Sequence, residues 1–471
     1  MMKVKLNSKI FLFLFFFIAL PTFLFSQQSY DITFKIGEIY VDTVVIKSYY
    51  GNKTIVIDSL KREKDGSFRL KKDNIHRGIG IFTVGKMDIF TFVFDKENKF
   101  EINLDDNWNY LVKGCQENDL YFEFQKANKQ IRFLESKTKR EIKENPKANK
   151  DSLNNIYSTE VNKFMSFQKE FYKSYPNHIM TKMVKALEDP QIPKEYLNGN
   201  QIDSTRKLEF IYYFRTHYWD NFDFSDNRLI ATPYFFTKQK TYMNELTMQS
   251  ADSIAVAIKD FIEKANQNNG LEYSKYILDY YIQMNRKLPF AYNEERFVEI
   301  VDRVVSGERT PWISPSEIET LKIEAEKIRP LLPEKQFINI SEKTLSGKTY
   351  NLHDVKTKYT VVYFWSAGCE SCKINLDKLE TFYKKFKNVY DFEIFSIDLD
   401  NNMEESIAFQ QKHPFDWIVL KSNSSLIKEK YNLDIEMTPD LYLLDKDKKI
   451  INHTPLYNQI EETIRSIEEE E

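Results

Sequence analysis

A Cys-x-x-Cys motif lies between two segments of contrasting pattern, and it constrains the fold more than any other part of this sequence. The motif, Cys369 to Cys372, follows the apolar run 360–365, whose β-branched and aromatic residues predict a buried strand. Apolar residues then recur at helical spacing over 373–386. We therefore expect the first cysteine at a helix N-terminus, where the helix dipole and free N–H groups favour a thiolate. The second cysteine should lie one turn further in, beneath the first, which suits a dithiol that opens and closes a disulfide.

Length and composition limit the classes of protein that this chain can belong to. Its 471 residues are enough for roughly two to four domains. Hydrophobic residues make up 42% and charged residues 29%, which is typical of a globular chain. The formal net charge is −3, with lysine and glutamate interspersed, so the chain lacks the basic surface of a nucleic-acid-binding protein.

The N-terminus has the pattern of a secretory signal. Lys3, Lys5 and Lys9 precede the apolar stretch 10–25, and we expect residues 1–26 to be removed as a signal peptide. An uncleaved anchor is the alternative, although the stretch is shorter than the about 20 residues of a spanning helix. No second apolar run of this length follows, so we expect no stable membrane insertion after cleavage.

Three further regions are expected along the chain. Residues 29–112 predict a small antiparallel β domain, because strand-type segments alternate with turn signals. Residues 118–329 predict an all-helical domain without a clear repeat. After a proline-containing linker at 329–333, strands and helices alternate through 334–471, which predicts an α/β domain with two antiparallel strands near its end.

The Cys-x-x-Cys motif and its surroundings resemble a known family. Residues 362–373, together with 437–445, are similar to the thioredoxin superfamily, most closely to TlpA-like thiol–disulfide oxidoreductases. The resemblance covers about 334–468 and implies a thioredoxin-like fold for that part. It also implies a cis peptide bond before Pro439, and a backbone edge beside the dithiol that pairs with an extended peptide.

The resemblance extends to substrate contacts and to cell location. Thr438, Pro439 and Trp365 are the residues that we expect to bind substrate, and Trp365 is also expected to be a core or wall residue of the sheet. The two front regions are similar, more loosely, to accessory domains found before thioredoxin modules in Bacteroidota. An exported protein of the periplasm or cell envelope is therefore implied.

Two positions depart from the family pattern. Tyr363 stands where many thioredoxins have a buried aspartate, and Gly368 stands where a tryptophan usually precedes the first cysteine. The proton acceptor of the dithiol is therefore open. The acidic candidates are Asp398, Asp400, Glu404 and Glu405.

The chemistry that we expect is thiol–disulfide exchange without a cofactor. Cys369 is the predicted nucleophile and Cys372 the predicted resolving thiol of a redox-active disulfide. Glu370 places a carboxylate beside the thiolate, which opposes the stabilisation by the helix dipole and favours a reductase over an oxidant. The expected partners are protein or peptide disulfides and an unidentified redox partner that recharges the dithiol.

Three other interpretations of the motif remain. A zinc half-site needs two more ligands, and His353, His413 and His453 are scattered, so we expect no metal. A structural disulfide would make the domain a redox-inactive binding scaffold. A peroxiredoxin-type peroxidase is the third alternative, because Ser366 lies three residues before Cys369.

Two residues outside the motif are expected to be structural. Cys115 stands alone and is predicted to be a small, partly buried residue. Trp219 lies in a run of acidic and aromatic residues, which we interpret as packing within the helical region rather than as a binding patch.

Overall fold

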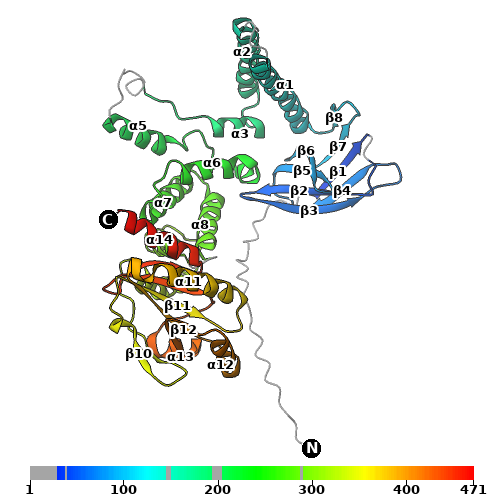
Figure 1. Cartoon of the computed structure of the whole chain (residues 1–471). Helices are drawn as coiled ribbons and strands as arrows, with labels where there is room; N and C mark the ends of the chain where they lie inside the picture. Colours follow the sequence, from blue (N-terminus) through cyan, green and yellow to red (C-terminus); the bar gives the residue numbers. More distant parts are fainter. Residues whose placement is uncertain (1–28, 38–39, 145–149, 194–203, 287–289, 471) are drawn as a thin grey trace, which may run out of the picture. The chain divides into compact units, whose positions relative to one another are not determined.

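The structure, a computed structural model, forms two compact units. Unit 1 comprises Met1–Asp189 and Asp226–Thr237, and unit 2 comprises Pro190–Ser225 and Lys238–Glu471. Described are residues 29–37, 40–144, 150–193, 204–286 and 290–470 (Figure 1). The predicted signal peptide, residues 1–26, lies outside these ranges. In the described ranges, no helix has both the length and the apolar character that crossing a membrane requires.

Unit 1 begins with a β sandwich of two four-stranded sheets. The strand orders are β4-β1-β7-β8 and β3-β2-β5-β6. Phe34 of β1 contacts Phe82 and Phe92 of the other sheet at ring-centroid distances of 5.2 Å, so aromatic side chains fill the space between the sheets. The strands are β1 (Ser29–Ile36), β2 (Thr43–Tyr50), β3 (Lys53–Lys61), β4 (Phe68–Asp73), β5 (Gly78–Val84), β6 (Met87–Phe94), β7 (Lys99–Leu104) and β8 (Tyr110–Lys113).

The small β domain is confirmed, with one departure from the antiparallel pattern. Strands β1 and β7 pair in parallel, with Phe34 opposite Ile102. A parallel pair needs a long crossover connection, and the strands between β1 and β7 in the chain provide it.

Unit 1 also contains helices α1 (Gln116–Glu144), α2 (Lys150–Ser174) and α3 (Ile179–Leu187), and the short helix η1 (Asn227–Ala231). Arg228 of η1 donates to Asp95, just after β6, and to the carbonyl oxygen of Asn177 at 2.7 Å. The sequence analysis did not single out α3. Its N-cap is His178, whose Nδ1 accepts from the Met180 N–H, rather than one of the usual capping residues.

Unit 2 opens with helices. They are α5 (Ser204–His217), α7 (Ala251–Gln267), α8 (Leu271–Arg286), α9 (Ala291–Arg303) and α10 (Pro315–Ile328), while the chain crosses from one unit to the other within α6 (Pro233–Asn244). Trp219 is 3% exposed and contacts the rings of Tyr242 and Phe261. The interpretation of Trp219 as a packing residue is therefore confirmed.

The C-terminal part of unit 2 is an α/β domain around a seven-stranded sheet, as predicted. The strand order is β10-β9-β13-β12-β11-β14-β15, with β11 parallel to β12 and antiparallel to β14. Its strands are β9 (Ser341–Lys343), β10 (Thr349–Asn351), β11 (Tyr359–Trp365), β12 (Phe392–Asp398), β13 (Ile418–Lys421), β14 (Asp440–Leu444) and β15 (Ile450–Thr454). Its helices are α11 (Glu370–Tyr390), α12 (Met403–Lys412), α13 (Ser424–Tyr431) and α14 (Tyr457–Glu470), and two short helices, η2 (Arg329–Leu331) and η3 (Leu352–Asp354), complete it.

Strand β11 is buried along its whole length because helices cover both faces of the sheet (Figure 1). Val361, Tyr363 and Trp365 pack on the face of α11 and α14. Val362 and Phe364 pack on the opposite face, with α13. Helices on both faces explain the continuous apolar run in the sequence.

We predict that Leu379→Ala will destabilise the protein by about 2–5 kcal/mol, because it leaves a cavity under α11, where Leu379 is fully buried. Urea unfolding followed by tryptophan fluorescence measures the change. The neighbouring Lys378 is exposed, and Lys378→Ala should stay within about 0.5 kcal/mol of the wild type. Equal effects of the two variants would contradict this packing.

Candidate functional site

The dithiol lies where β11 ends and α11 begins. Cys369 is the N-cap of α11, and its Sγ accepts from the Cys372 N–H at 3.2 Å. Cys369 and Cys372 are joined in a disulfide; Cys369 is half-buried, whereas Cys372 is 0% exposed. The predicted placement of both cysteines is confirmed. A free N–H directed at Cys369 would stabilise the thiolate form of that sulfur.

The predicted cis-proline segment lies beside the first cysteine. The Thr438–Pro439 peptide bond is cis. The Sγ of Cys369 is 3.5 Å from the carbonyl oxygen of Thr438, and both Thr438 and Pro439 are half-buried. The structure therefore brings these two predicted substrate-binding residues to the dithiol, although they are far from it in the sequence.

Of the two expectations for Trp365, the structure supports a core residue rather than one that is exposed to substrate. Its side chain is 0% exposed and contacts the rings of Phe409 and Phe415. The strand is covered by helices on both faces, so the last residue of β11 points into the core. Trp365 belongs to the same buried cluster as Cys372, so its side chain forms part of the core under the dithiol.

Asp400 holds the loop that leads into the first cysteine. Its Oδ2 accepts from Ser366 Oγ at 2.5 Å and from the Gly368 N–H at 2.8 Å. Burial would raise the pKa of Asp400, but the hydrogen bonds from Ser366, Asn402 and Gly368 outweigh it, so the pKa lies below its ordinary value. The charged carboxylate of Asp400 is therefore bound to Gly368, the residue directly before the nucleophile.

The loop that contains Asp400 is itself held by a lysine. Lys421 Nζ donates to the carbonyl oxygens of Asp398, Asp400 and Ser422, at 3.2, 2.6 and 2.8 Å. Burial is the main influence on Lys421 and lowers its pKa, against the charges of the two aspartates. Three backbone acceptors on one amine fix the path of the chain after β12.

The other three acidic candidates differ from Asp400. Asp398 accepts from the Asp400 N–H at 2.9 Å and from Gln410 at 3.3 Å. Glu404 and Glu405 are exposed on α12. Among the four, Asp400 is the one whose side chain hydrogen-bonds to the residues directly before Cys369.

The two departures from the family pattern have structural explanations. A Cβ added to Gly368 would lie 3.3 Å from Asp400 Oδ2 and 3.6 Å from Glu405 Oε1, so the two carboxylates occupy the space beside this residue. Tyr363 donates its hydroxyl to the carbonyl oxygen of Cys372 at 3.0 Å. Burial holds the pKa of Tyr363 far above its ordinary value, so this residue stays protonated and cannot accept a proton from Cys372.

The residues between the two cysteines are polar. Glu370 is 84% exposed, and its carboxylate is 3.7 Å from Lys373 Nζ. Ser371 Oγ is 3.3 Å from Cys369 Sγ, a contact that the sequence analysis did not identify. Solvent and Lys373 weaken the effect of Glu370 on the thiolate, whereas Ser371 can donate to it.

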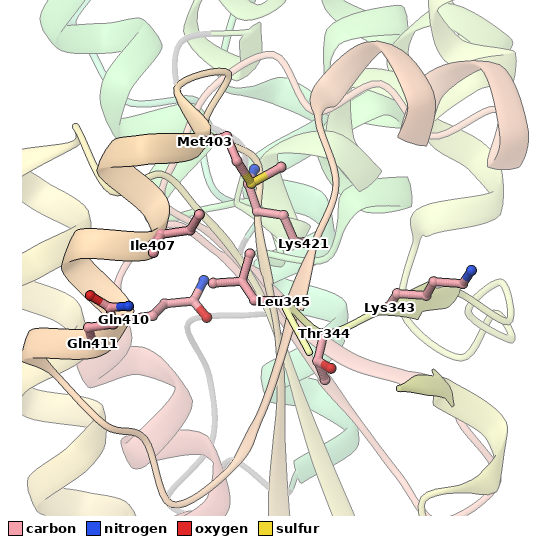
Figure 2. Close-up of a pocket in the computed structure, with 8 residues that line it drawn as sticks. All are labelled: Lys343, Thr344, Leu345, Met403, Ile407, Gln410, Gln411 and Lys421. Carbon is pink, nitrogen blue, oxygen red and sulfur yellow. The ribbon is translucent and has the colours of Figure 1, made fainter. Parts of the chain in front are cut away.

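A shallow pocket lies on one side of the same domain, between α12 and the β9–β10 hairpin (Figure 2). Its apolar lining residues are Leu345, Met403 and Ile407, and Lys343 and Lys421 add positive charge. Neither cysteine lines this pocket, and Lys421 connects it to the loop of Asp400 through hydrogen bonds to the backbone.

Two further candidates from the sequence are a metal site and the third cysteine, Cys115. Within the described ranges, no three His, Cys, Asp or Glu side chains are grouped so that they could hold a metal ion. Cys115, in unit 1, forms no disulfide and is more deeply buried than the partly buried residue that we expected, and burial raises its thiol pKa to about 11. A thiol with such a pKa is nearly all protonated at neutral pH and is a poor nucleophile.

We predict that Asp400→Asn will destabilise the oxidised protein by about 1–3 kcal/mol at pH 7, because a charged acceptor of two hydrogen bonds is lost. The folded-state pKa of Asp400 is lowered, so its contribution is present above the unfolded-state pKa and is lost as the pH falls through the folded-state pKa. The difference between wild type and variant should therefore shrink in acid. Thermal unfolding at several pH values checks this, with Asp377→Asn on the exposed face of α11 as the control.

Comparison with known proteins agrees with this geometry. Residues 333–453 match the model of the AhpC/TSA family, and residues 136–330 match a domain of unknown function, DUF5106. The second match falls on the predicted helical domain, whose helices the structure divides between the two units.

Curated relatives match only the C-terminal part. The thiol-disulfide oxidoreductase ResA of one Bacillus cereus strain is 26% identical over 117 residues, which are 25% of this chain and 66% of the relative. ResA of Bacillus thuringiensis subsp. konkukian is 26% identical over 136 residues, 28% of this chain and 77% of the relative. The chain thus spans about two thirds to three quarters of the length of these relatives.

Among solved structures, a thioredoxin-like protein from Bacteroides caccae is 21% identical, with a TM-score of 0.47, over 59% of this chain and 97% of that one.

The sheet order, the cis Thr438–Pro439 bond and the match over 333–453 all concern the same part of the chain. The C-terminal domain therefore has a thioredoxin-like fold, matches the model of the AhpC/TSA family and is similar in sequence to thiol-disulfide oxidoreductases of the ResA type.

Proposed function

We propose that the chain is an exported thiol–disulfide oxidoreductase that reduces disulfides of proteins or peptides. One observation supports this above all: a half-buried sulfur at a helix N-cap lies between an N–H donor and the carbonyl oxygen of the cis-proline segment, above a buried second sulfur. Cys369 is the nucleophile in this proposal, and Cys372 is the resolving thiol.

The reaction is a two-step exchange. The Cys369 thiolate attacks one sulfur of the substrate disulfide, which forms a mixed disulfide and releases the other sulfur as a thiolate. Cys372 then loses its proton and attacks the Cys369 sulfur, which forms the Cys369–Cys372 disulfide and releases the second substrate thiolate. Two electrons pass from the dithiol to the substrate, and an external thiol reductant must restore the dithiol before the next cycle.

The charges near Cys369 support the direction that we propose for the reaction. Asp400 and Glu370 both bring negative charge to this end of α11, and Asp400 is held in its charged form by hydrogen bonds. Negative charge opposes the stabilisation of the thiolate by the helix N-terminus, and a less stabilised thiolate makes a less oxidising couple. Reduction of substrates is therefore the direction that we propose.

The place of action and the partners are part of the same proposal. Export rests on the basic and apolar pattern of residues 3–26. An extended segment of a substrate would pair with the backbone at Thr438 and Pro439, beside the disulfide. The redox partner would supply thiol electrons in the same compartment, the periplasm or cell envelope.

A peroxidase is not favoured by the geometry. The Ser366 hydroxyl donates to Asp400 Oδ2, and its hydrogen bond is thus directed at the carboxylate rather than at Cys369. The remaining alternative is the redox-inactive scaffold, which the following experiment distinguishes from the enzyme.

We predict that Cys372→Ser will accumulate a mixed disulfide with protein substrates, because Cys369 still attacks and no resolving thiol remains. Cys369→Ser should form no such adduct, since its two remaining thiols, Cys372 and Cys115, are both buried. Non-reducing gels and mass spectrometry of the trapped species provide the measurement. The wild type should also reduce insulin with dithiothreitol faster than Cys369→Ser; equal rates would favour the scaffold.

We predict a reduction potential for the Cys369–Cys372 couple well below about −120 mV, the value of a strong oxidant. Glu370→Gln should raise the potential by no more than about 30 mV, because an exposed charge has a weak effect. Equilibration with glutathione buffers and thiol alkylation measure both values. A wild-type potential near that of the strong oxidant would rule out the reductase.

A further inference from the structure

A buried histidine lies between two carboxylates in unit 2. His453 of β15 is 3% exposed at its side chain. Its Nε2 is 2.6 Å from Asp440 Oδ1, and its Nδ1 is 2.7 Å from Glu294 Oε2. A neutral imidazole has a single N–H and can donate to one of these oxygens, whereas the imidazolium donates to both.

The charged form of this histidine is strongly favoured. Burial alone would lower the pKa of His453, but the charges and hydrogen bonds of Asp440 and Glu294 outweigh it and raise the pKa to about 10. The ring also stacks on Tyr442, with centroids 4.0 Å apart and planes inclined by 6°. We call Glu294, His453 and Asp440 the His453 cluster.

One end of the His453 cluster adjoins the dithiol. Asp440 is the first residue of β14 and directly follows Pro439 of the cis peptide bond. Asp440 lies opposite Phe364 of β11. The carbonyl oxygen of Thr438, two residues before Asp440, is 3.5 Å from Cys369 Sγ. The position of Asp440 therefore determines where the backbone of Thr438 and Pro439 lies beside Cys369.

The other end of the His453 cluster belongs to the helical region. Glu294 lies in the first turn of α9 and is 159 residues from His453 in the sequence. Removing one partner of a buried ion pair strongly destabilises the folded protein. The contact between Glu294 and His453 therefore restrains α9 and β15 relative to each other.

A second set of contacts holds α9 against the same strand. Arg329, at the start of the segment that joins the helices to the sheet, forms two hydrogen bonds with Asp302 of α9, at 2.9 and 3.0 Å. Leu331 packs against the core of the thioredoxin-like domain. The Glu334 N–H donates to the carbonyl oxygen of Ile450, the first residue of β15. The segment predicted as a linker is therefore docked on the sheet.

We propose that Glu294 and His453 are positioning residues of the thiol–disulfide site: they fix Asp440, and with it the cis Thr438–Pro439 segment, in the place that presents an extended substrate to Cys369. The helical region then has a role in substrate alignment. The catalytic part of this inference rests on the proposed reductase function, whereas the structural part does not.

The test compares Glu294→Gln with Glu295→Gln in the full chain. Glu294→Gln keeps an oxygen that can accept from His453 but removes its charge, so the Asp440–His453 pair remains. Glu295 is the exposed neighbour on α9, and its variant makes the same change of charge without touching the His453 cluster. Glu294→Asp is the second variant if Glu294→Gln fails to fold. Its side chain is one methylene shorter, so the carboxylate keeps its charge but lies further from His453.

The first measurement does not depend on activity. Hydrogen exchange of the oxidised protein, followed by mass spectrometry, should be roughly fivefold faster over residues 438–444 in Glu294→Gln, because a charge-assisted hydrogen bond becomes a neutral one. Exchange over β11 should be unchanged, and Glu295→Gln should match the wild type. Unchanged exchange over 438–444, or an equal effect of Glu295→Gln, would overturn the proposal.

The second measurement is kinetic. Glu294→Gln should raise the KM for insulin reduction roughly fivefold, the factor expected for hydrogen exchange, while kcat stays nearly constant. The variant should reduce glutathione disulfide as the wild type does, because this small substrate offers little backbone for pairing. A wild-type KM in this variant, despite faster exchange, would overturn the positioning role. If the wild type itself reduces no disulfide, the proposed reductase function fails, while the exchange data still decide whether the His453 cluster holds the cis-proline segment.

Discussion

The burial of strand β11 is the constraint that sets the active-site geometry. All seven of its residues, from Tyr359 to Trp365, are buried between helices on the two faces of the sheet. Because the strand is fixed, the segment 366–368 leads from it to the surface at a defined point and places Cys369 at the N-cap of α11. The same helix keeps Cys372 inside, so one strand-to-helix junction separates an accessible sulfur from an inaccessible one.

Around this junction, the electrostatics come from groups that no local pattern connects. Asp400, from the loop after β12, binds the chain before Cys369, and Lys421, from β13, holds that loop by backbone oxygens. The cis-proline segment leads into β14 and lies beside Cys369. The His453 cluster holds Asp440, the residue directly after this segment. The parallel strands β11, β12 and β13 end at one edge of the sheet, and the antiparallel strand β14 begins at that edge, which is why segments so distant in sequence meet there.

Several features of the fold could be predicted because they depend on local periodicity. The run 360–365 and the helical spacing of 373–386 correspond closely to β11 and α11, and the cis bond before Pro439 followed from the family resemblance. Helix α3 was not singled out, because its N-cap is a histidine whose role depends on a hydrogen bond to the Glu117 carbonyl in another helix. The parallel β1–β7 pair likewise depends on packing partners far along the chain.

Local sequence was enough to specify the position of the dithiol, the fold of its domain and the succession of strands and helices around it, because each of these is encoded by neighbours within a few residues. Packing in three dimensions was needed to select the carboxylate that holds the nucleophile's loop, to bring Gly368 against two carboxylates, and to make His453 a buried cation between Asp440 and Glu294. Those contacts join residues between 13 and 159 positions apart. Their strength depends on exclusion of water, which arises only when the sheet and helices pack together.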